Sequence, residues 1–285
     1  MRQSPAWRSY ERRAAAGQLD GISGSLVDES GRLALSSDGE KEAEFFRSAL
    51  AGRERVLDLG CGNGFPLLVL AERVPWIVGL DASPTMLALA RKNAALLGLG
   101  NVWIVRGVVE RLPFAARSFD GMAIGGTLES IADPGPALTE LARVATSGAV
   151  VASLEQDFRA RLAQEDEREQ RWFRQDRDGV YLHVRLLLTE PYRVRHDRYL
   201  LDPTSEIVRN ARRALEHARE GRVRADIAPG ELPAGVIHDA SREVEAQYDP
   251  ATLCSAFEAA GFQAVEQEVR ESYGVPHIFS VFRRR

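Results

Sequence analysis

Residues 56–65 read VLDLGCGNGF, a short apolar run followed by a loop that contains three glycines. The continuous apolar run from Arg55 to Cys61 is typical of a parallel strand that is covered on both faces. A helical pattern follows over residues 66–74, so Gly60, Gly62 and Gly64 stand where a strand turns into a helix. Glycine permits positive φ and a close approach of the backbone to a ligand. Ligands of such sheets bind outside the carboxyl ends of the strands. The stretch therefore predicts a nucleotide-like binding site on an α/β sheet.

The alternation of strands and helices continues on both sides of this motif. A helix is expected to begin with Ser83 as its N-cap and Pro84 as its first residue. Similar helix starts occur at Asp133-Pro134 and Asp249-Pro250. We expect a three-layer, Rossmann-like α/β fold with a seven-stranded, mostly parallel sheet whose last strand is antiparallel. The expected strands after the first are Trp76–Asp81, Asn101–Val108, Phe119–Gly126, Ala149–Glu155, Gln263–Glu271 and His277–Arg284.

The alternation stops at Glu155 and resumes at Asp249. Residues 156–248 are charged and mostly helical in pattern, with extended pieces over Val180–Leu188 and Tyr192–Leu201. We therefore expect a largely helical insertion over residues 156–248 that forms a cap or substrate subdomain. The core domain comprises residues 51–155 and 249–285, and residues 1–50 form an N-terminal helical cover.

The composition is that of a soluble globular protein of 285 residues, with a formal net charge of −4. That charge disfavours a protein that binds nucleic acid through its phosphates. No apolar run reaches the roughly 18 residues of a membrane helix, and the charged N-terminus lacks a signal peptide, so we expect a cytoplasmic protein without membrane contact. Two cysteines make neither a disulfide framework nor a structural zinc site, and we expect no metal. The sequence does not determine the oligomeric state, and a homodimer is one of the states compatible with it.

An acidic residue at the end of the second strand narrows the ligand. Asp81 stands 17 residues after Gly64, where a carboxylate can accept two hydrogen bonds from a ribose diol. Glycine-rich turns of this kind also serve NAD and FAD. The dinucleotide enzymes favour the spacing GxGxxG, whose third glycine would fall at Phe65.

The sequence LDLGCGNG resembles the first motif of class I S-adenosylmethionine (SAM)-dependent methyltransferases, with its GxGxG core. The stretch Gly107–Phe114 (GVVERLPF) is similar to the GDAExLPF segment of that family. SFDGMAI, DPGPALTELARVA and the AAGF near the C-terminus match its later landmarks. The resemblance covers about residues 50–155 and 249–285, and it implies SAM as the cofactor.

The resemblance also implies where the cofactor binds. Asp58 would face the methionine amino group and Asp81 the ribose. Val108 stands where the family commonly has an acid that reads the adenine amino group, so apolar contacts and the Val109 amide would hold the adenine instead. The expected cofactor-binding residues are Asp58, Gly60, Cys61, Gly62, Gly64, Asp81, Ala82, Met86, Val108, Val109 and Gly125.

Methyl transfer from a sulfonium mainly requires alignment, and a base helps only when the acceptor must lose a proton. Glu129 follows the fourth strand, at the substrate side of the family's fold, and is a candidate catalytic residue. A purely structural role for Glu129, as a loop acid that makes hydrogen bonds, agrees equally well with the sequence. His196, among charged and aromatic residues, is the second candidate. His183, in an alternating apolar stretch, is more typical of a packed strand histidine. Three tyrosines of the insert suit either an acceptor pocket or interior packing: Tyr181, Tyr192 and Tyr199.

We expect a methyltransferase that acts on O, N or C of a small molecule enclosed by the insert. A methyltransferase acting on RNA or protein is the competing possibility. Against it, GGTLES follows the fourth strand in place of the Asn/Asp-Pro-Pro-aromatic motif of the amino-group methylases. A non-catalytic SAM-binding protein also fits the motifs, whereas the glycine spacing disfavours an NAD enzyme.

Overall fold

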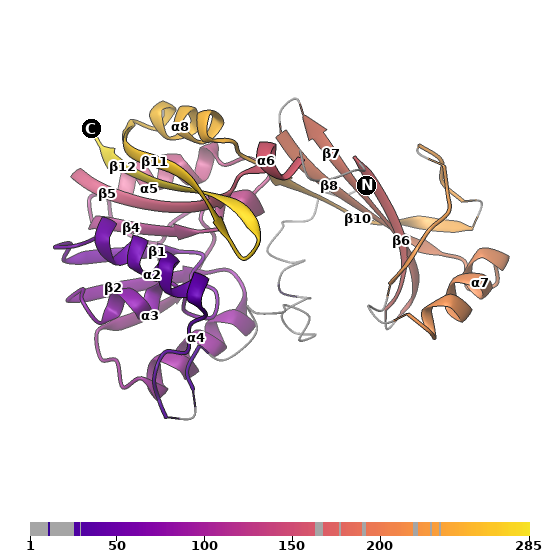
Figure 1. Ribbon diagram of the computed structural model, residues 1–285, viewed down its shortest axis with the longest axis horizontal. Helices are drawn as coiled ribbons and strands as arrows, with labels where there is room; N and C mark the ends of the chain where they lie inside the picture. The colour runs from indigo at the N-terminus through magenta and orange to yellow at the C-terminus, as the bar shows by residue number, and fades with distance from the viewer. Residues whose placement is uncertain are drawn as a thin grey trace.

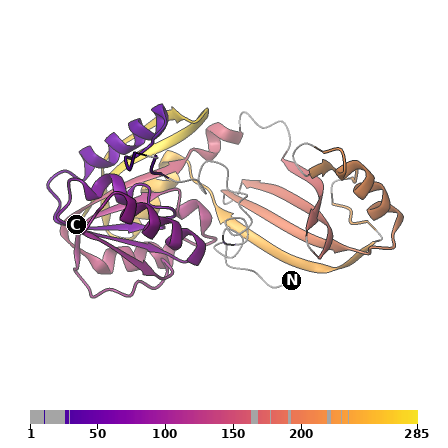
Figure 2. The same cartoon turned by 90° about the horizontal axis from the view of Figure 1, so that it is seen from below.

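The computed structural model describes residues 11, 26–28, 30–162, 168–176, 178–189, 192–218, 222–228, 230–233 and 235–285. Two sheets organise these residues, one of seven strands and one of five. The seven-stranded sheet lies at one end of the long axis of the molecule and the five-stranded sheet at the other (Figure 1). The view from below shows the same side-by-side arrangement (Figure 2). Most of the expected N-terminal cover, residues 1–10 and 12–25, falls outside the described residues.

The seven-stranded sheet has the strand order β11-β12-β5-β4-β1-β2-β3. Its parallel strands are β1 (Arg55–Leu59), β2 (Trp76–Asp81), β3 (Val102–Arg106), β4 (Phe119–Gly125) and β5 (Ala145–Gln156). β12 (Val275–Arg284) pairs antiparallel with β5, and β11 (Phe262–Ser272) pairs antiparallel with β12. The expected seven-stranded, mostly parallel sheet is confirmed. The fifth strand begins at Ala145, four residues before the expected start.

Helices cover both faces of this sheet because apolar side chains point to both sides of its strands. Val56 of β1 packs with α2 (Ser37–Ala49), α3 (Leu67–Ala71) and α4 (Pro84–Leu96). Leu57, the next residue, packs with α5 (Gly135–Val144) and α8 (Pro250–Ala259) on the opposite face. The three-layer core follows from this alternation.

The expected helix starts at Pro84 and Pro250 are present and are explained by their side-chain caps, whereas α5 begins at Gly135, one residue after Pro134, without a side-chain cap. The Ser83 hydroxyl accepts a hydrogen bond of 3.1 Å from the Met86 amide, and Pro84 is the first residue of α4. At α8, the Asp249 carboxylate accepts the Thr252 amide at 2.8 Å while the Thr252 hydroxyl accepts the Asp249 amide at 2.9 Å. This reciprocal pair is a capping box, which fixes the chain where it returns to the core.

The prediction of a largely helical insertion is wrong. The described residues within 156–248 form an antiparallel sheet of order β10-β8-β7-β6-β9, with two helices among them, α6 (Phe158–Leu162) and α7 (Glu206–Leu215). The expected extended pieces are two of its strands. The strands are β6 (Glu169–Asp176), β7 (Gly179–Thr189), β8 (Tyr192–Leu201), β9 (Arg222–Arg224) and β10 (Val236–Ala246).

Charged residues that pair on the five-stranded sheet explain why the sequence of residues 156–248 lacks the pattern of strands. One face is apolar and packs against Val208 and Ala211 of α7. Even on this side of β8, however, Asp197 is buried between Arg195 and Arg242, with the Arg242 Nε at 2.7 Å. Because ionic residues occupy both faces, the period of two that normally marks a strand is weak in the sequence.

Two chain segments connect the sheets. Asp157, just after β5, forms a parallel bridge with Tyr248, and the Phe158 amide donates to the Tyr248 carbonyl at 2.7 Å. Phe158 is fully buried against Leu187 and Val194 of the second sheet. The chain therefore leaves the core and returns to it at the carboxyl end of β5. Within the described part of the chain, no helix is both long enough and apolar enough to cross a membrane.

Candidate functional site

The loop between β1 and α3 turns above the carboxyl end of the core sheet. Gly60, Gly62 and Gly64 have φ values of +70°, +52° and +114°. A Cβ on Gly60 would lie 2.1 Å from the Thr127 Oγ1, and one on Gly64 would lie 2.6 Å from a Leu68 methyl carbon. Positive φ and these close contacts together require glycine at both positions.

This loop is fixed to the neighbouring strands. The amides of Gly60 and Cys61 donate to the Leu80 carbonyl at 2.7 and 3.0 Å. The Thr127 hydroxyl, beyond β4, donates to the Leu59 carbonyl at 2.8 Å. Cys61 is completely buried, and burial raises the pKa of its thiol well above the ordinary value, so the thiol stays protonated. The glycine loop is thus a rigid part of the sheet edge.

Asp58 lies in β1, immediately before the loop, and is completely buried. Its Oδ2 accepts a hydrogen bond of 2.9 Å from the Leu67 amide, whereas Oδ1 has no hydrogen-bond partner among the described residues. Burial, together with the nearby charge of Asp81, raises the pKa of Asp58 to about 8. A buried carboxyl oxygen without a partner fits an ammonium group, or a water bound to one, which would supply the missing donor.

Asp81 ends β2 and connects the loop to the start of α4. Its Oδ2 accepts the Gly62 amide at 3.0 Å and its Oδ1 accepts the Ser83 amide at 2.8 Å. Burial raises the pKa of Asp81, and these backbone hydrogen bonds oppose that shift. Each carboxylate oxygen has a further lone pair, so both remain able to accept a ribose hydroxyl. The glycine loop and Asp81, which are both expected to bind the cofactor, are therefore in direct contact through the Gly62 amide.

The other expected cofactor residues lie around these two aspartates. Met86 is completely buried, and its Cε would be 3.6 Å from a Cβ on Gly62. Val109 is buried while Val108 is 37% exposed. The Gly107 amide donates to the Asp81 carbonyl at 3.0 Å, so the loop after β3 begins beside the acid. Ala82 follows Asp81 in the chain, and Gly125 is the last residue of β4.

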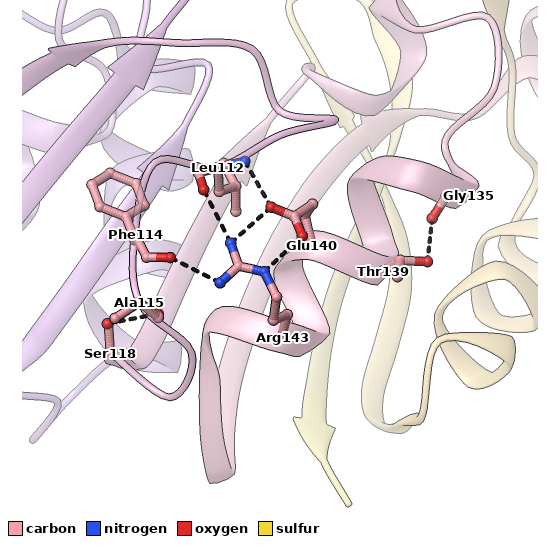
Figure 3. A network of polar contacts seen from close by, with 8 residues as sticks. All are labelled: Leu112, Phe114, Ala115, Ser118, Gly135, Thr139, Glu140 and Arg143. Carbon is pink, nitrogen blue, oxygen red and sulfur yellow. Dashed lines mark hydrogen bonds and ion pairs between the residues drawn. The ribbon is translucent and has the colours of Figure 1, made fainter.

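The loop after β3 is held from the opposite side by α5. The Arg143 guanidinium donates to the Phe114 and Leu112 carbonyls at 2.8 and 3.0 Å. Glu140 accepts the Leu112 amide at 2.8 Å and pairs with Arg143 at 2.7 Å (Figure 3). These contacts give the LPF stretch a structural role, because they fix the loop that begins beside Asp81.

Sequence reasoning missed Glu11, which contacts the start of α4. Its carboxylate accepts hydrogen bonds from the Ser83 hydroxyl and from the Thr85 hydroxyl, the latter at 2.6 Å. Burial raises the pKa of Glu11, but the hydrogen bonds from Ser83 and Thr85 outweigh this effect and lower it overall. A carboxylate at a helix N-terminus is also favoured by the helix dipole.

Two glutamates from neighbouring strand ends interact at the carboxyl side of β4 and β5. Glu129 lies in the short helix η1 (Leu128–Ser130), and Glu155 is completely buried near the end of β5. Glu155 Oε1 accepts the Leu128 amide at 3.4 Å, and its Oε2 accepts the Glu129 amide at 3.3 Å. Glu129 Oε2 in turn accepts the Gln156 amide at 3.0 Å. Burial, together with the charge of Glu129, raises the pKa of Glu155 well above the ordinary value.

Tyr248 joins this pair from the chain that returns from the insert. It is 4% exposed, and its hydroxyl has no hydrogen-bond partner among the described residues. Burial and the charge of Glu155 raise the pKa of Tyr248, Glu129 and Asp133 add to this effect, and Arg193 opposes it. The phenol therefore stays protonated beside the two glutamates.

His196, the second predicted catalytic residue, stands on β8 of the five-stranded sheet and not in the core. Its Nε2 lies 3.0 Å from the Nδ1 of His183, and Trp172 stacks on both rings with centroid distances of 5.3 and 5.4 Å. His183 is 6% exposed. Burial, with the nearby His196, Arg198 and Arg174, lowers the pKa of His183 to about 2, so its ring is neutral.

The tyrosines of the insert differ in their surroundings. Arg198 lies over the Tyr181 ring, 3.6 Å from its centroid, on the side of the sheet that carries His183. Tyr199 belongs to the apolar cluster that packs against α7, so interior packing accounts for it. The Tyr192 side chain lies outside the described residues.

The sequence contained one signal for the buried cluster near the strand ends. Glu155 is the only acid in the apolar run AVVASLE, and an acid that ends a doubly covered strand needs partners to be buried. Tyr248 gave no comparable signal, because its position depends on where the chain returns from the insert.

Residues 51–184 match a family model described as a methyltransferase domain. This stretch contains the glycine loop, Asp81, Glu129 and Glu155. The demethylmenaquinone methyltransferase of Lactiplantibacillus plantarum is 38% identical over 110 residues, which are 37% of this chain and 46% of that protein. The chain thus spans about half the length of this curated relative.

Solved structures match a larger share of the chain. The [4+2]-cyclase SpnF gives a TM-score of 0.59 at 14% identity, covering 100% of this chain and 98% of that one. The CcbJ methyltransferase from Streptomyces caelestis gives 0.57 at 18% identity, covering 87% and 90%. At these identities the likeness concerns the fold. The expected resemblance is therefore confirmed as a methyltransferase domain over residues 51–184 and as a likeness of fold to solved structures.

Proposed function

We propose that the chain is an enzyme that transfers a methyl group from SAM to a small-molecule acceptor. The observation that carries this proposal is the contact between the Gly62 amide and the Asp81 carboxylate above the buried, partly unpaired Asp58. The arrangement offers acceptors for a ribose diol and for an ammonium group on one glycine loop. SAM carries both groups, whereas NAD has no ammonium group to pair with Asp58.

The position of the second sheet supports a small acceptor. The chain leaves the core toward this sheet at Asp157, directly beyond the carboxyl end of β5, at the edge of the core sheet where ligands bind (Figure 1). An added domain at this edge can surround an acceptor and exclude water. The Lactiplantibacillus relative is named for a small acceptor, demethylmenaquinone, which agrees with this proposal.

The roles of individual residues follow from where they stand. Asp58 and Asp81 bind the cofactor's amino and ribose groups, and Gly60, Gly62 and Gly64 let the backbone approach it. Bound SAM supplies a methyl group that is already activated by its sulfonium, so no metal is required. Glu129, beyond β4, is the first candidate to accept a proton from the acceptor, and His196 of β8 is the second. We also infer a cytoplasmic enzyme that acts independently of nucleic acid and membranes.

Labelled SAM tests the proposal directly. The protein is incubated with methyl-labelled SAM and either the small-molecule fraction or the protein and RNA fractions of a cell extract. We expect label in the small-molecule fraction, and Asp81→Ala should reduce it. Label in protein or RNA would favour a macromolecular acceptor. SAM binding without any label transfer would favour a non-methylating protein of this fold. SpnF, which shares the fold and is named as a [4+2]-cyclase, is an example of a protein with this fold that is not named for methyl transfer.

A further inference from the structure

The two glutamates at the ends of β4 and β5 hold each other's chain segments. Glu155, on β5, accepts the amides at the start of η1, and Glu129, on η1, accepts the amide of Gln156 on β5. Each carboxyl group thus binds the backbone that carries the other. The arrangement resembles a capping box, but it joins two segments that are 26 residues apart in the chain.

The fold alone does not require an acid at position 155. The preceding β5 residues 149–154 are buried, and an apolar side chain at position 155 would continue that pattern. Burying a carboxyl group is unfavourable unless its hydrogen bonds are made, and an apolar residue of similar size is often at least as stable there. The buried acid therefore indicates a role for the segment that it holds, which is the loop carrying Glu129.

A third polar group completes the cluster from another part of the chain. The Tyr248 hydroxyl is buried near both glutamates and has no partner among the described residues. The Ala246 amide, two residues earlier, donates to the Ile131 carbonyl at 2.6 Å, which ties this segment to the same loop. A buried phenol without a partner is available as a donor to a bound molecule.

We propose that Glu155 is a positioning residue that fixes the loop after β4, so that the Glu129 carboxylate and the Tyr248 hydroxyl meet the methyl acceptor. This inference rests on the proposed function. It also names the acceptor class, a molecule whose reacting atom carries a proton, such as a hydroxyl or an amine. The acceptor's lone pair forms the bond to the methyl carbon, the electron pair of the broken carbon–sulfur bond stays on sulfur, and the acceptor's proton passes to Glu129.

Amide hydrogen exchange of the full-length protein tests this arrangement without a known acceptor. Glu155→Ala should accelerate exchange of the Leu128 and Glu129 amides by about tenfold, the effect of one lost hydrogen bond, and Glu155→Gln should restore part of the protection. Glu129→Ala should accelerate exchange at Gln156. Glu42→Ala is the matched control, because Glu42 is also a buried glutamate but binds the Ser272 hydroxyl at 2.6 Å in another part of the core. It should leave these three amides unchanged.

The transfer assay with labelled SAM and the small-molecule fraction supplies the functional readout. Glu155→Ala and Glu129→Gln should each lower the rate by at least about tenfold while the affinity for S-adenosylhomocysteine stays unchanged. Glu155→Gln should retain most of the rate. Unchanged exchange in Glu155→Ala, or equal acceleration throughout the core, would overturn the positioning role. If the wild-type protein transfers no label, the proposed function fails, and the exchange data still decide whether the two glutamates hold each other.

Discussion

Gly60 and Thr127 lie so close together that a methyl group on the glycine would stand 2.1 Å from the threonine hydroxyl oxygen. Gly60 begins the loop after β1, and Thr127 begins the segment that leads to Glu129. The Thr127 hydroxyl also donates to the Leu59 carbonyl at 2.8 Å. The proposed cofactor loop and the proposed acceptor-side loop are therefore in direct contact at these two residues, and the effect of a substitution at one of them should depend on the side chain at the other.

Replacing Gly60 tests this contact. Gly60→Ala should destabilise the protein by about 2 kcal/mol or more, because it combines the collision with the strain of alanine at positive φ. In a Thr127→Ala background, which removes the collision together with the hydrogen bond to Leu59, the further change Gly60→Ala should cost only about 1 kcal/mol, from the strain. Denaturant unfolding of the single and double variants measures both. Strictly additive effects of the two substitutions would show that the residues do not interact.

Asp81 should carry a large share of the cofactor affinity. Asp81→Ala removes charge-assisted hydrogen bonds, so the affinity for S-adenosylhomocysteine should fall by about 10- to 100-fold. Asp81→Asn removes the charge and keeps one acceptor oxygen, so it can accept only one of the Gly62 and Ser83 amides and should also bind more weakly than the wild-type protein. Asp226→Ala, at an exposed aspartate of the insert, is the control and should bind normally. Wild-type affinity in Asp81→Ala would remove Asp81 from the site.

The core fold could be predicted from the sequence, and so could the placement of most residues of the proposed cofactor site, because both depend on local signals. The strand ending at Leu59 and the glycines after it are adjacent in the chain, and Ser83-Pro84 marks a helix start wherever it occurs. The same applies to Asp81, whose place at the end of β2 follows from the strand pattern. The structure adds that the Asp81 carboxylate accepts a hydrogen bond from the Gly62 amide.

The features that could not be predicted depend on contacts between distant residues. In the insert, charged residues that pair across strands, such as the buried Asp197 of β8 with Arg242 of β10, interrupt the alternation of apolar and polar residues that marks a strand. The cluster of Glu129, Glu155 and Tyr248 forms only because the chain leaves the core after β5 and returns beside η1. Neither local propensity nor spacing encodes that return.

Cofactor binding should release a proton through Asp58. Burial raises the pKa of this carboxyl group to about 8, so it is mostly protonated in the free protein at about pH 7. A positively charged amino group beside it favours the ionised form, and up to about one proton should leave on binding. Titration calorimetry with S-adenosylhomocysteine in phosphate and in Tris should then give different apparent enthalpies. Asp58→Asn should give equal ones, and equal enthalpies for the wild-type protein would contradict the assignment.

The buried His183 should make the protein sensitive to acid. Burial lowers the pKa of His183 to about 2 in the folded state, so below its ordinary pKa of about 6.5 the unfolded chain binds a proton that the folded chain does not. Stability from this group is present above about pH 6.5 and falls as the pH decreases, by about 2 kcal/mol at about pH 5. Urea unfolding of the wild-type protein and of His183→Gln should show this difference. If the unfolding free energies of the two proteins changed equally with pH, His183 would be protonated in the folded protein as it is in the unfolded chain.

The central claim is that the glycine loop, Asp58 and Asp81 form a SAM site. Titration calorimetry of the full-length protein with S-adenosylhomocysteine and, separately, with NAD tests it most directly. The account predicts that S-adenosylhomocysteine binds with a dissociation constant in the micromolar range, on the order of −8 kcal/mol, and that NAD does not bind. Binding of NAD without binding of S-adenosylhomocysteine would contradict it.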